Sequence, residues 1–209
     1  MRKASGWQTK GLLVGNQMMK KIILSSNSPR RKELLTGLDI PFEVKVLSGI
    51  DESYPEGLGV EEIPQYIAME KAAAYDIAED EIVITADTVV VLGDAILGKP
   101  VDESDAKNML RALSGNTHRV VTGVCITSAD KQRKFSVVSE VTFKVLSDTE
   151  IDYYVNRYRP FDKAGAYGIQ EWIGYVGVTS LKGSYFNVMG LPVQRIYEEL
   201  IHEFDVVVK

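Results

Sequence analysis

Asp87 is the residue of this sequence whose surroundings point most directly to chemistry. It lies in the stretch IVITADTVVV, in which nearly every neighbour is apolar or β-branched. A carboxylate is rare in strands and costly to bury without a partner. One interpretation is an edge or bulged position that leaves the carboxylate in water. The other is that the group has a partner: a metal ion, a cation, or a water molecule that it deprotonates.

Two adjacent arginines, Arg30 and Arg31, stand where a helix dipole disfavours them. The preceding residues ILSSNSP end an apolar run and supply Ser28 as an N-cap and Pro29 as the first helical residue. Because a helix N-terminus already carries partial positive charge, the pair indicates an anion site built from free N–H groups and the guanidinium forks. The alternative is that both side chains point into water.

Other charged positions are weak signals when each is taken alone. Glu52, or its neighbour Asp51, lies in a polar loop, Lys71 lies in an alanine-rich segment, and Lys99 precedes a proline. Each of these settings is also typical of an exposed surface. The stretch FDKAGAYGIQ has glycines that allow a backbone to approach a ligand closely, but it is also compatible with a plain turn.

Several common chemistries are excluded. Pro100 follows Lys99 where a Walker loop requires Ser or Thr, and no dinucleotide fingerprint or G-x-S-x-G elbow is present. The single Cys125 excludes an intramolecular disulfide and a cysteine-cluster zinc site, and reads as a core residue. The two histidines, His118 and His202, are too few for a histidine-rich zinc site, and both are expected at the surface.

Composition limits the partners. The 209 residues are 45% hydrophobic and 25% charged, as in an ordinary globular protein, with a net charge of −5. An acidic chain is a poor match for a nucleic-acid surface, so a nucleotide would have to be held by a few local cations, a metal ion, or both. The sequence has no apolar run of membrane length, so no membrane partner is expected, and a cytoplasmic location is the default.

Residues 1–18 differ in character from the rest of the chain and are expected to be a leader or extended start that is disordered. Their apolar stretch is too short for a signal peptide, and they lack a periodic apolar face. Their deletion is therefore expected to leave activity and thermal stability unchanged. Residues 19–209 are expected to form a single domain with two lobes around a cleft.

Periodicity and turn signals predict a mixed-sheet α/β protein with a cleft, because helices and strands alternate early and strands pair late. Gly93-Asp94 indicates a hairpin, and Ser147 with Glu150 forms a capping box. The stretch 160–192 is rich in glycine and nearly devoid of helix signals. The expected strands and extended segments are 20–25, 42–50, two runs on either side of Gly93-Asp94 within 81–100, 119–127 and 134–146. The expected helices are 29–38, 61–78, 102–113, 148–158 and 192–204.

Seven blocks occur together in one order and at characteristic distances: SSNSPRRKELL, MEKA, TADTVV, GKP, LSGNTHRVVTG, DKAGAYGIQ and GLP. In this combination the chain resembles the Maf family of nucleoside-triphosphate pyrophosphatases from Lys20 to about Phe204. The resemblance implies an α/β fold, with a mixed β-sheet, flanking helices and a central nucleotide cleft, similar to the inosine-triphosphate pyrophosphatases. It also implies hydrolysis of a nucleoside triphosphate to a monophosphate and pyrophosphate.

The resemblance assigns roles to particular positions. The catalytic aspartate of the family falls on Asp87. The loop glutamate falls on Glu52, which with Asp87 would bind a divalent metal, Mg²⁺ in preference to Mn²⁺. The residues that would contact the substrate phosphates are Ser26, Ser28, Arg31, Lys71 and Lys99. The resemblance favours Asp87 as the general base, although metal ligation by the same carboxylate stays open.

Three further positions separate pyrimidine-specific members from a sister group that prefers methylated guanine nucleotides. They hold Arg30, Thr88 and Gln170 here, similar to the pyrimidine type, whereas the sister group has Trp, Gln and Glu. The Gln170 amide offers a donor and an acceptor that match uracil and thymine, so dTTP and UTP are the expected substrates, with modified pyrimidine nucleotides also open.

Two other function classes compete with this one. A non-hydrolytic nucleotide-binding regulator of division or stress has no need for the intact Asp87, Glu52 and lysines. An RNA-binding module is disfavoured by the acidic charge and by the lack of aromatic residues near the arginines. The aromatics Trp172 and Tyr175 could mark a homodimer interface or line the cleft.

Overall fold

A single mixed sheet of seven strands forms the centre of the computed structural model, which describes residues 20–207. The strand order is β2-β1-β3-β5-β6-β7, with β4 paired to β3. The strands are β1 Lys21–Ser25, β2 Phe42–Val44, β3 Glu81–Leu92, β4 Ala95–Leu97, β5 Thr117–Ser128, β6 Gln132–Phe143 and β7 Val178–Lys182. Strand β1 runs parallel to β2 and β3, and the other pairs are antiparallel, which confirms the predicted mixed-sheet α/β class.

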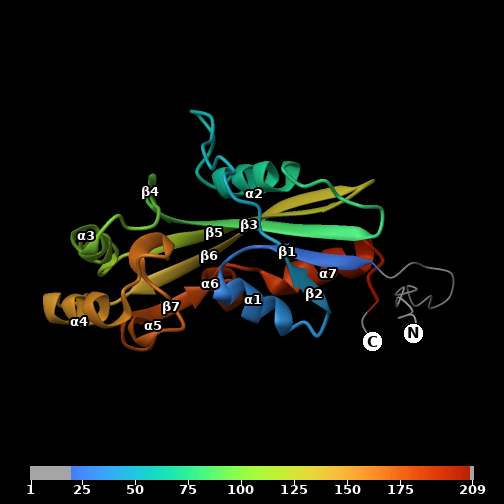
Figure 1. Ribbon diagram of the computed structural model, residues 1–209. Helices are drawn as coiled ribbons and strands as arrows, with labels where there is room; N and C mark the ends of the chain where they lie inside the picture. Colours follow the sequence, from blue (N-terminus) through green and yellow to red (C-terminus); the bar gives the residue numbers. More distant parts are fainter. Residues whose placement is uncertain (1–19, 208–209) are drawn as a thin grey trace, which may run out of the picture.

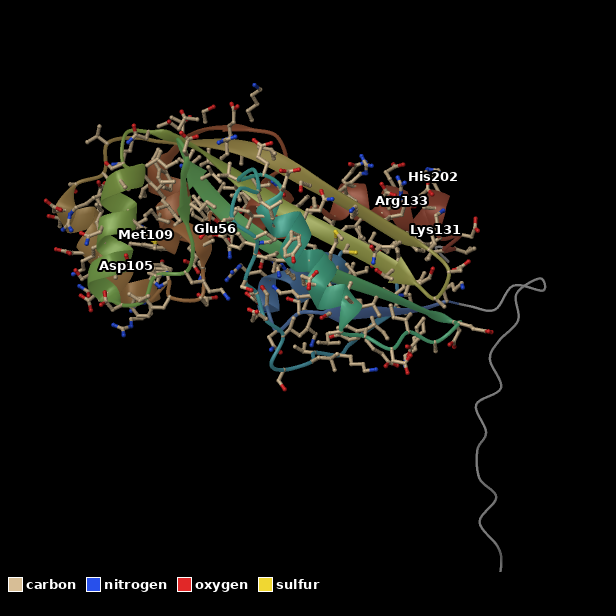
Figure 2. All side chains as sticks on the ribbon, turned by 90° about the horizontal axis from the view of Figure 1, so that it is seen from above. Glu56, Asp105, Met109, Lys131, Arg133 and His202 are labelled. Atoms are coloured by element: carbon tan, nitrogen blue, oxygen red, sulfur yellow. The ribbon has the colours of Figure 1, made fainter. Side chains whose placement is uncertain are left out.

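Helices cover the sheet on both faces. They are α1 Pro29–Thr36, α2 Ile63–Ala73, α3 Glu103–Leu113, α4 Asp148–Tyr158, the 3-10 helix η1 Ala164–Ala166, α5 Trp172–Gly177, α6 Tyr185–Met189 and α7 Val193–Glu203. Figure 1 shows α2 on one face and α1 and α7 on the other, with α3 and α4 side by side at one end. At the opposite end Arg133 of β6, and Lys131 just before this strand, lie beside α7, close to His202 (Figure 2).

The core follows from the long β-branched runs of β3 and β5. Ile82 and Ile84 are fully buried in β3, as is Cys125 in β5, which confirms the core position predicted for the cysteine. Near-continuous apolar strands of this kind are buried on both faces. Within residues 20–207 no helix is long and apolar enough to cross a membrane.

Gly123 of β5 allows α2 to lie unusually close to the sheet. A Cβ atom at this position would stand only 2.1 Å from the backbone nitrogen of Gln65, so no larger residue fits without moving the helix. The buried Thr85 hydroxyl also donates a 2.6 Å hydrogen bond to the Ala68 carbonyl of α2. These two contacts fix the distance of α2, the helix that carries Lys71, from the sheet, and its position along the strands.

The prediction that both histidines lie at the surface is wrong for His118. His202 is exposed, but His118 is only 1% exposed, with its Nε2 atom 2.7 Å from the Tyr167 hydroxyl and its ring against Phe143. Strand β5 begins earlier than expected, at Thr117, and side chains of a strand alternate between its two faces. His118 therefore belongs to the inward-facing set that includes Val120.

The glycine-rich stretch 160–192 contains more helix than its sequence predicts. It forms η1, α5 and α6, each of six residues or fewer, together with β7. Such short helices have no room for an apolar period, and α6 depends on local caps instead: Ser184 accepts the Asn187 N–H, and Gly190 adopts φ 112°. The hairpin at Gly93 and the Ser147–Glu150 capping box are both confirmed.

Other elements of the predicted architecture are not decided by the fold. Tyr175 is 83% exposed and Trp172 packs edge-on against Tyr153, so a homodimer interface there stays a prediction. Neither residue lines the two cavities of the central cleft. The two-lobed division of 19–209 also stays a prediction, and the leader 1–18 lies outside the described residues.

Candidate active site

The cleft opens where strand β1 ends and β3 continues. The last pair between the two parallel strands is Ser25 with Thr85, and Asp87 follows two residues later, paired with Gly123 of β5. In open α/β sheets, ligands bind beyond the carboxyl ends of parallel strands, where loops lead into helices. Here the loop 26–28 leads from β1 into α1 at that point.

Asp87 has a charged partner, so the interpretation of an edge or bulged position open to water is wrong. Strand β3 lies inside the sheet, and its pairing with β5 is regular from Ile82 to Val91. The side chain of Asp87 is 17% exposed, and its Oδ1 atom lies 3.0 Å from Nζ of Lys71. The unusual carboxylate in an apolar strand is thus stabilised by a cation from the helix above it.

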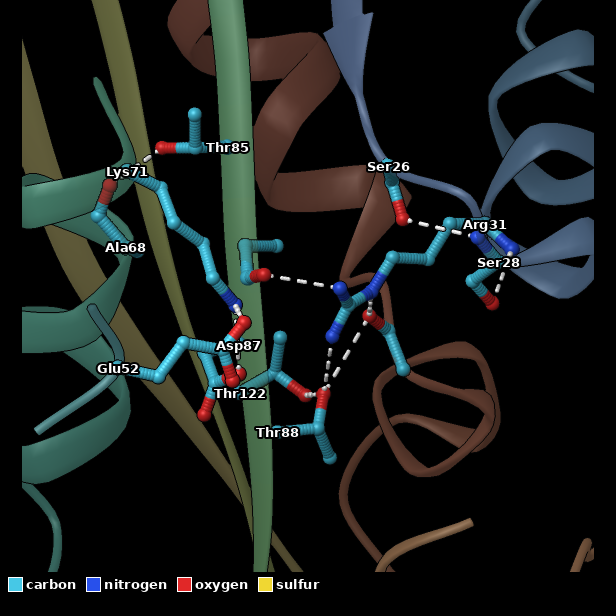
Figure 3. Close-up of polar contacts among 12 residues, drawn as sticks. Ser26, Ser28, Arg31, Glu52, Ala68, Lys71, Thr85, Asp87, Thr88 and Thr122 are labelled. Carbon is cyan, nitrogen blue, oxygen red and sulfur yellow. Dashed lines mark hydrogen bonds and ion pairs between the residues drawn. The ribbon is translucent and has the colours of Figure 1, made fainter. Parts of the chain in front are cut away.

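Lys71 bridges two carboxylates. Its Nζ atom is 3.0 Å from Oδ1 of Asp87 and 3.0 Å from Oε1 of Glu52, and its side chain is 14% exposed (Figure 3). Glu52 comes from the long loop before α2 and is 55% exposed at its side chain. Three residues of the predicted site, far apart in sequence, are therefore brought together. Asp51 instead accepts hydrogen bonds from Ser53 in its own loop.

Arg31 lines the cleft, and its guanidinium group donates hydrogen bonds to other groups of the protein. Its Nε donates to the Gly190 carbonyl at 2.8 Å, Nη1 to the Ala86 carbonyl at 2.8 Å, and Nη2 to the Thr88 hydroxyl at 3.0 Å (Figure 3). Burial lowers the pKa of this guanidinium from its usual value, and the nearby Asp87 acts in the opposite direction. A guanidinium has five N–H donors, so part of its capacity remains for a ligand.

The serines order the loop before α1. Ser28 is the N-cap predicted from sequence: its hydroxyl accepts the Arg31 N–H at 3.4 Å, while its own N–H donates to the Ser26 hydroxyl at 3.2 Å. Both hydroxyl groups keep a proton that can be donated to an anion. Lys99 is exposed beside the cleft, and its ammonium group makes no hydrogen bond or ion pair within residues 20–207.

Two adjoining cavities make up the cleft. One, of about 390 Å³, contains the predicted phosphate and metal positions Ser26, Ser28, Glu52, Lys71 and Lys99. The other, of about 130 Å³, contains Asp87 and the three predicted base-reading residues Arg30, Thr88 and Gln170. Arg31, Lys71 and Lys99 line both cavities, so every predicted site residue faces one continuous cleft.

The wall around Gln170 contains two charged residues, Asp162 and Lys163, to which the sequence analysis assigned no role. Arg30 donates a 2.8 Å hydrogen bond to Oδ2 of Asp162, and Lys163 lies 2.8 Å from Oδ1 of the same carboxylate. Burial alone would raise the pKa of Asp162, but hydrogen bonds from Lys163 and Arg30 outweigh it and hold this pKa at about 2. The two adjacent charged residues in the stretch FDKAGAYGIQ were the sequence signal that could have indicated this part of the site.

The donor set fits a divalent metal of the magnesium type. Glu52 and Asp87 supply hard carboxylate oxygens on one side of the cleft, and they share a single lysine. Within residues 20–207, no group of three or more acidic, histidine or cysteine side chains forms a complete protein cage. Mg²⁺ is commonly bound by one or two carboxylates together with substrate phosphates and water, so a complete cage is not required.

Comparison with known proteins identifies the family of the chain. The sequence model of the family described as Maf-like protein matches residues 21–203. The chain belongs to the Maf family. A relative from Phocaeicola vulgatus named dTTP/UTP pyrophosphatase is 64% identical over 182 residues, which are 86% of this chain and 94% of that protein. One of the same name from Porphyromonas gingivalis is 56% identical over 90% of this chain and 96% of the relative.

Among solved structures, this Maf-family chain aligns with a nucleoside-triphosphatase / dITP/XTP pyrophosphatase from Mycobacterium abscessus. The alignment has a TM-score of 0.42 and 12% identity, and it covers 86% of this chain and 93% of the other.

Proposed function

We propose that this protein is a nucleoside-triphosphate pyrophosphatase that hydrolyses dTTP and UTP in preference to purine nucleotides. The observation that carries the proposal is the position of Asp87, a carboxylate in a cleft whose walls hold Arg31, Lys71 and Lys99. The names of the relatives, dTTP/UTP pyrophosphatase, support the same activity and the same substrates. No feature of the cleft favours a non-hydrolytic regulator.

The reaction breaks the bond between the α- and β-phosphates. A water molecule attacks the α-phosphorus, its oxygen forms the new P–O bond, and Asp87 accepts the proton that the water loses. The bond to the bridging oxygen of the β-phosphate breaks, and pyrophosphate leaves. The products are a nucleoside monophosphate and pyrophosphate.

The cations of the cleft would stabilise the leaving group. Pyrophosphate carries more negative charge as it departs, and Lys71 and Lys99 line the larger cavity where it would lie. Lys71 already forms ion pairs with Glu52 and Asp87 at 3.0 Å each, so it can exchange a carboxylate for a phosphate oxygen over a short distance. Arg31, tied to Gly190 and Ala86, would orient the substrate with its remaining donors.

Glu52 and Asp87 would hold a divalent metal, Mg²⁺ in preference to Mn²⁺, with the substrate phosphates completing its coordination. Such an ion supplies Lewis-acid stabilisation of the negative charge on the phosphates. The proposal leaves the general-base role with Asp87. A cytoplasmic location stays an expectation from the sequence.

A screen of pyrophosphate release tests the proposal. The purified protein is incubated with each common ribo- and deoxynucleoside triphosphate in the presence of Mg²⁺ or Mn²⁺. We expect dTTP and UTP to give the highest kcat/KM and to yield pyrophosphate rather than orthophosphate. Release of orthophosphate, equal hydrolysis of purines, or tight binding without turnover would each overturn it.

A further inference from the structure

Lys163 is a lysine enclosed between two carboxylates at the wall of the smaller cavity. It is 8% exposed, and its Nζ atom lies 2.8 Å from Oδ1 of Asp162 and 3.1 Å from Oε1 of Glu171. Lysine is rarely buried unless it is paired. The proposed hydrolysis gives this ammonium group no role.

Through one of its two carboxylate partners, Asp162, Lys163 is connected to Arg30. Asp162 uses its two oxygens separately, one for Lys163 and one for the Arg30 guanidinium at 2.8 Å. Arg30 lies on α1, far from Lys163 in sequence, and its side chain is 22% exposed. The position of Arg30 at the cavity therefore depends on a carboxylate that Lys163 holds.

Through its other partner, Glu171, Lys163 is connected to a buried tyrosine beside Gln170. Glu171 accepts a hydrogen bond from the hydroxyl of Tyr154, which is fully buried, and this hydroxyl in turn accepts the Gly168 N–H at 3.0 Å. Burial raises the pKa of Tyr154, so its hydroxyl remains a donor to Glu171. The backbone on both sides of Gln170 is therefore fixed through Glu171 and Gly168.

The side-chain amide of Gln170 must be held in a well-defined position if it is to bind a base. Gln170 lines the smaller cavity, and its Oε1 atom is buried with no hydrogen-bond partner within the described residues. A buried acceptor left without a donor is costly, so the ligand is expected to supply the donor. A small displacement of this amide would weaken that bond, because hydrogen bonds are steeply dependent on distance and angle.

From this arrangement we propose that Lys163 is a positioning residue for base selection, which aligns Arg30 through Asp162 and Gln170 through Glu171. The inference rests on the proposed function, because it concerns how the same cleft discriminates between bases. Lys163 holds the two base-reading side chains from opposite directions. Its loss should affect which base is accepted more than the rate of the chemical step.

The test compares Lys163→Met with a matched control, Lys107→Met. Lys107 also bridges two carboxylates, Glu103 and Asp152, at 2.9 Å each, but neither it nor its partners line the cleft. We expect Lys163→Met to lower the ratio of kcat/KM for dTTP over GTP by about tenfold or more, mainly through a higher KM for dTTP. Lys107→Met should leave the ratio unchanged at a similar loss of melting temperature.

A second variant covers the case in which Lys163→Met does not fold. Asp162→Asn keeps the shape of an exposed side chain and removes only the charge that joins Lys163 to Arg30. It should lower the same ratio severalfold, with kcat for dTTP little changed. An unchanged ratio in the folded variants would overturn the inference. A wild-type protein without pyrimidine preference would instead overturn the proposed function, so the two failures are distinguishable.

Discussion

The two sides of the cleft hold their charges in different ways. On the base side, Arg30, Asp162, Lys163, Glu171 and Tyr154 form one continuous series of hydrogen bonds and ion pairs that ends in the core. On the phosphate side, Lys71 is shared by two carboxylates, and Lys99 is exposed with no such contact within residues 20–207.

This difference indicates that one side of the cleft selects the base and that the other side serves the hydrolysis itself. A site whose polar groups are fixed before the ligand arrives discriminates strongly, because a wrong base leaves those groups unpaired. A site that must meet a changing phosphate charge needs cations that can exchange partners as the leaving group departs. We therefore expect substitutions on the phosphate side to change the rate for all nucleotides alike, and substitutions on the base side to change their order.

Asp87→Asn should have the largest effect. The amide keeps the shape of the side chain and leaves Lys71 paired with Glu52, but it can no longer accept the proton of the attacking water. Turnover should fall about a hundredfold to ten-thousandfold for every nucleotide. Pyrophosphate release measures the loss, and circular dichroism checks the fold. Retention of more than half the wild-type rate would remove Asp87 from the catalytic role.

Gln170→Glu should change the order of substrates instead. A carboxylate in place of the amide repels the carbonyl oxygens of uracil and thymine and favours the adjacent N–H donors of guanine. The preference for dTTP over GTP should fall by about 2 kcal/mol, or roughly thirtyfold. The measurement is kcat/KM for both nucleotides, with kcat for dTTP as the internal control. An unchanged ratio would mean that Gln170 does not read the base.

The sequence predicts those parts of the site that depend on local signals. Ser28 and Pro29 start α1 as predicted, and the misplaced charge of Asp87 marks the site because few side chains contradict an apolar strand so clearly. Lys163 and Tyr154 were not assigned. Their importance comes from burial and from partners such as Glu171, which packing alone brings together.

The error at His118 has the same origin. Whether a histidine near the start of a strand faces water or the core depends on a shift of one residue, which periodicity does not fix reliably. The resemblance to the Maf family supplied the roles of Glu52, Lys71 and Lys99, which are unremarkable residues when taken singly. The structure places all of them around one cleft.

His118 should make stability depend on pH on the base side of the cleft. Burial lowers the pKa of His118 to about 4, and Tyr167, its hydrogen-bond partner, lines the smaller cavity. The unfolded chain, with an ordinary histidine pKa near 6.5, binds the proton more readily. The contribution to stability is therefore complete above about pH 6.5 and is lost as the pH falls towards 4.

Between pH 7 and pH 5 the loss from this group should be about 2 kcal/mol. Urea unfolding at both pH values measures it, with His118→Gln as the comparison, because glutamine can still bond to the Tyr167 hydroxyl but does not titrate. Equal pH dependence in wild type and His118→Gln would show that the buried ring is already protonated or reached by water.

Lys99→Ala should have the smallest effect and tests the phosphate side at its most open point. Lys99 is exposed and makes no ion pair within the described residues, so its removal leaves no buried charge behind and should not alter the fold. An exposed cation that meets the triphosphate contributes about 1 kcal/mol, so KM should rise roughly fivefold for dTTP and GTP alike. Because salt screens such contacts, the difference from wild type should shrink as ionic strength increases. Lys32→Ala, the same loss of charge at an exposed position of α1 outside both cavities, is the control. If Lys99→Ala changed the ratio of the two nucleotides rather than both values together, the division between the two sides of the cleft would be wrong at this residue.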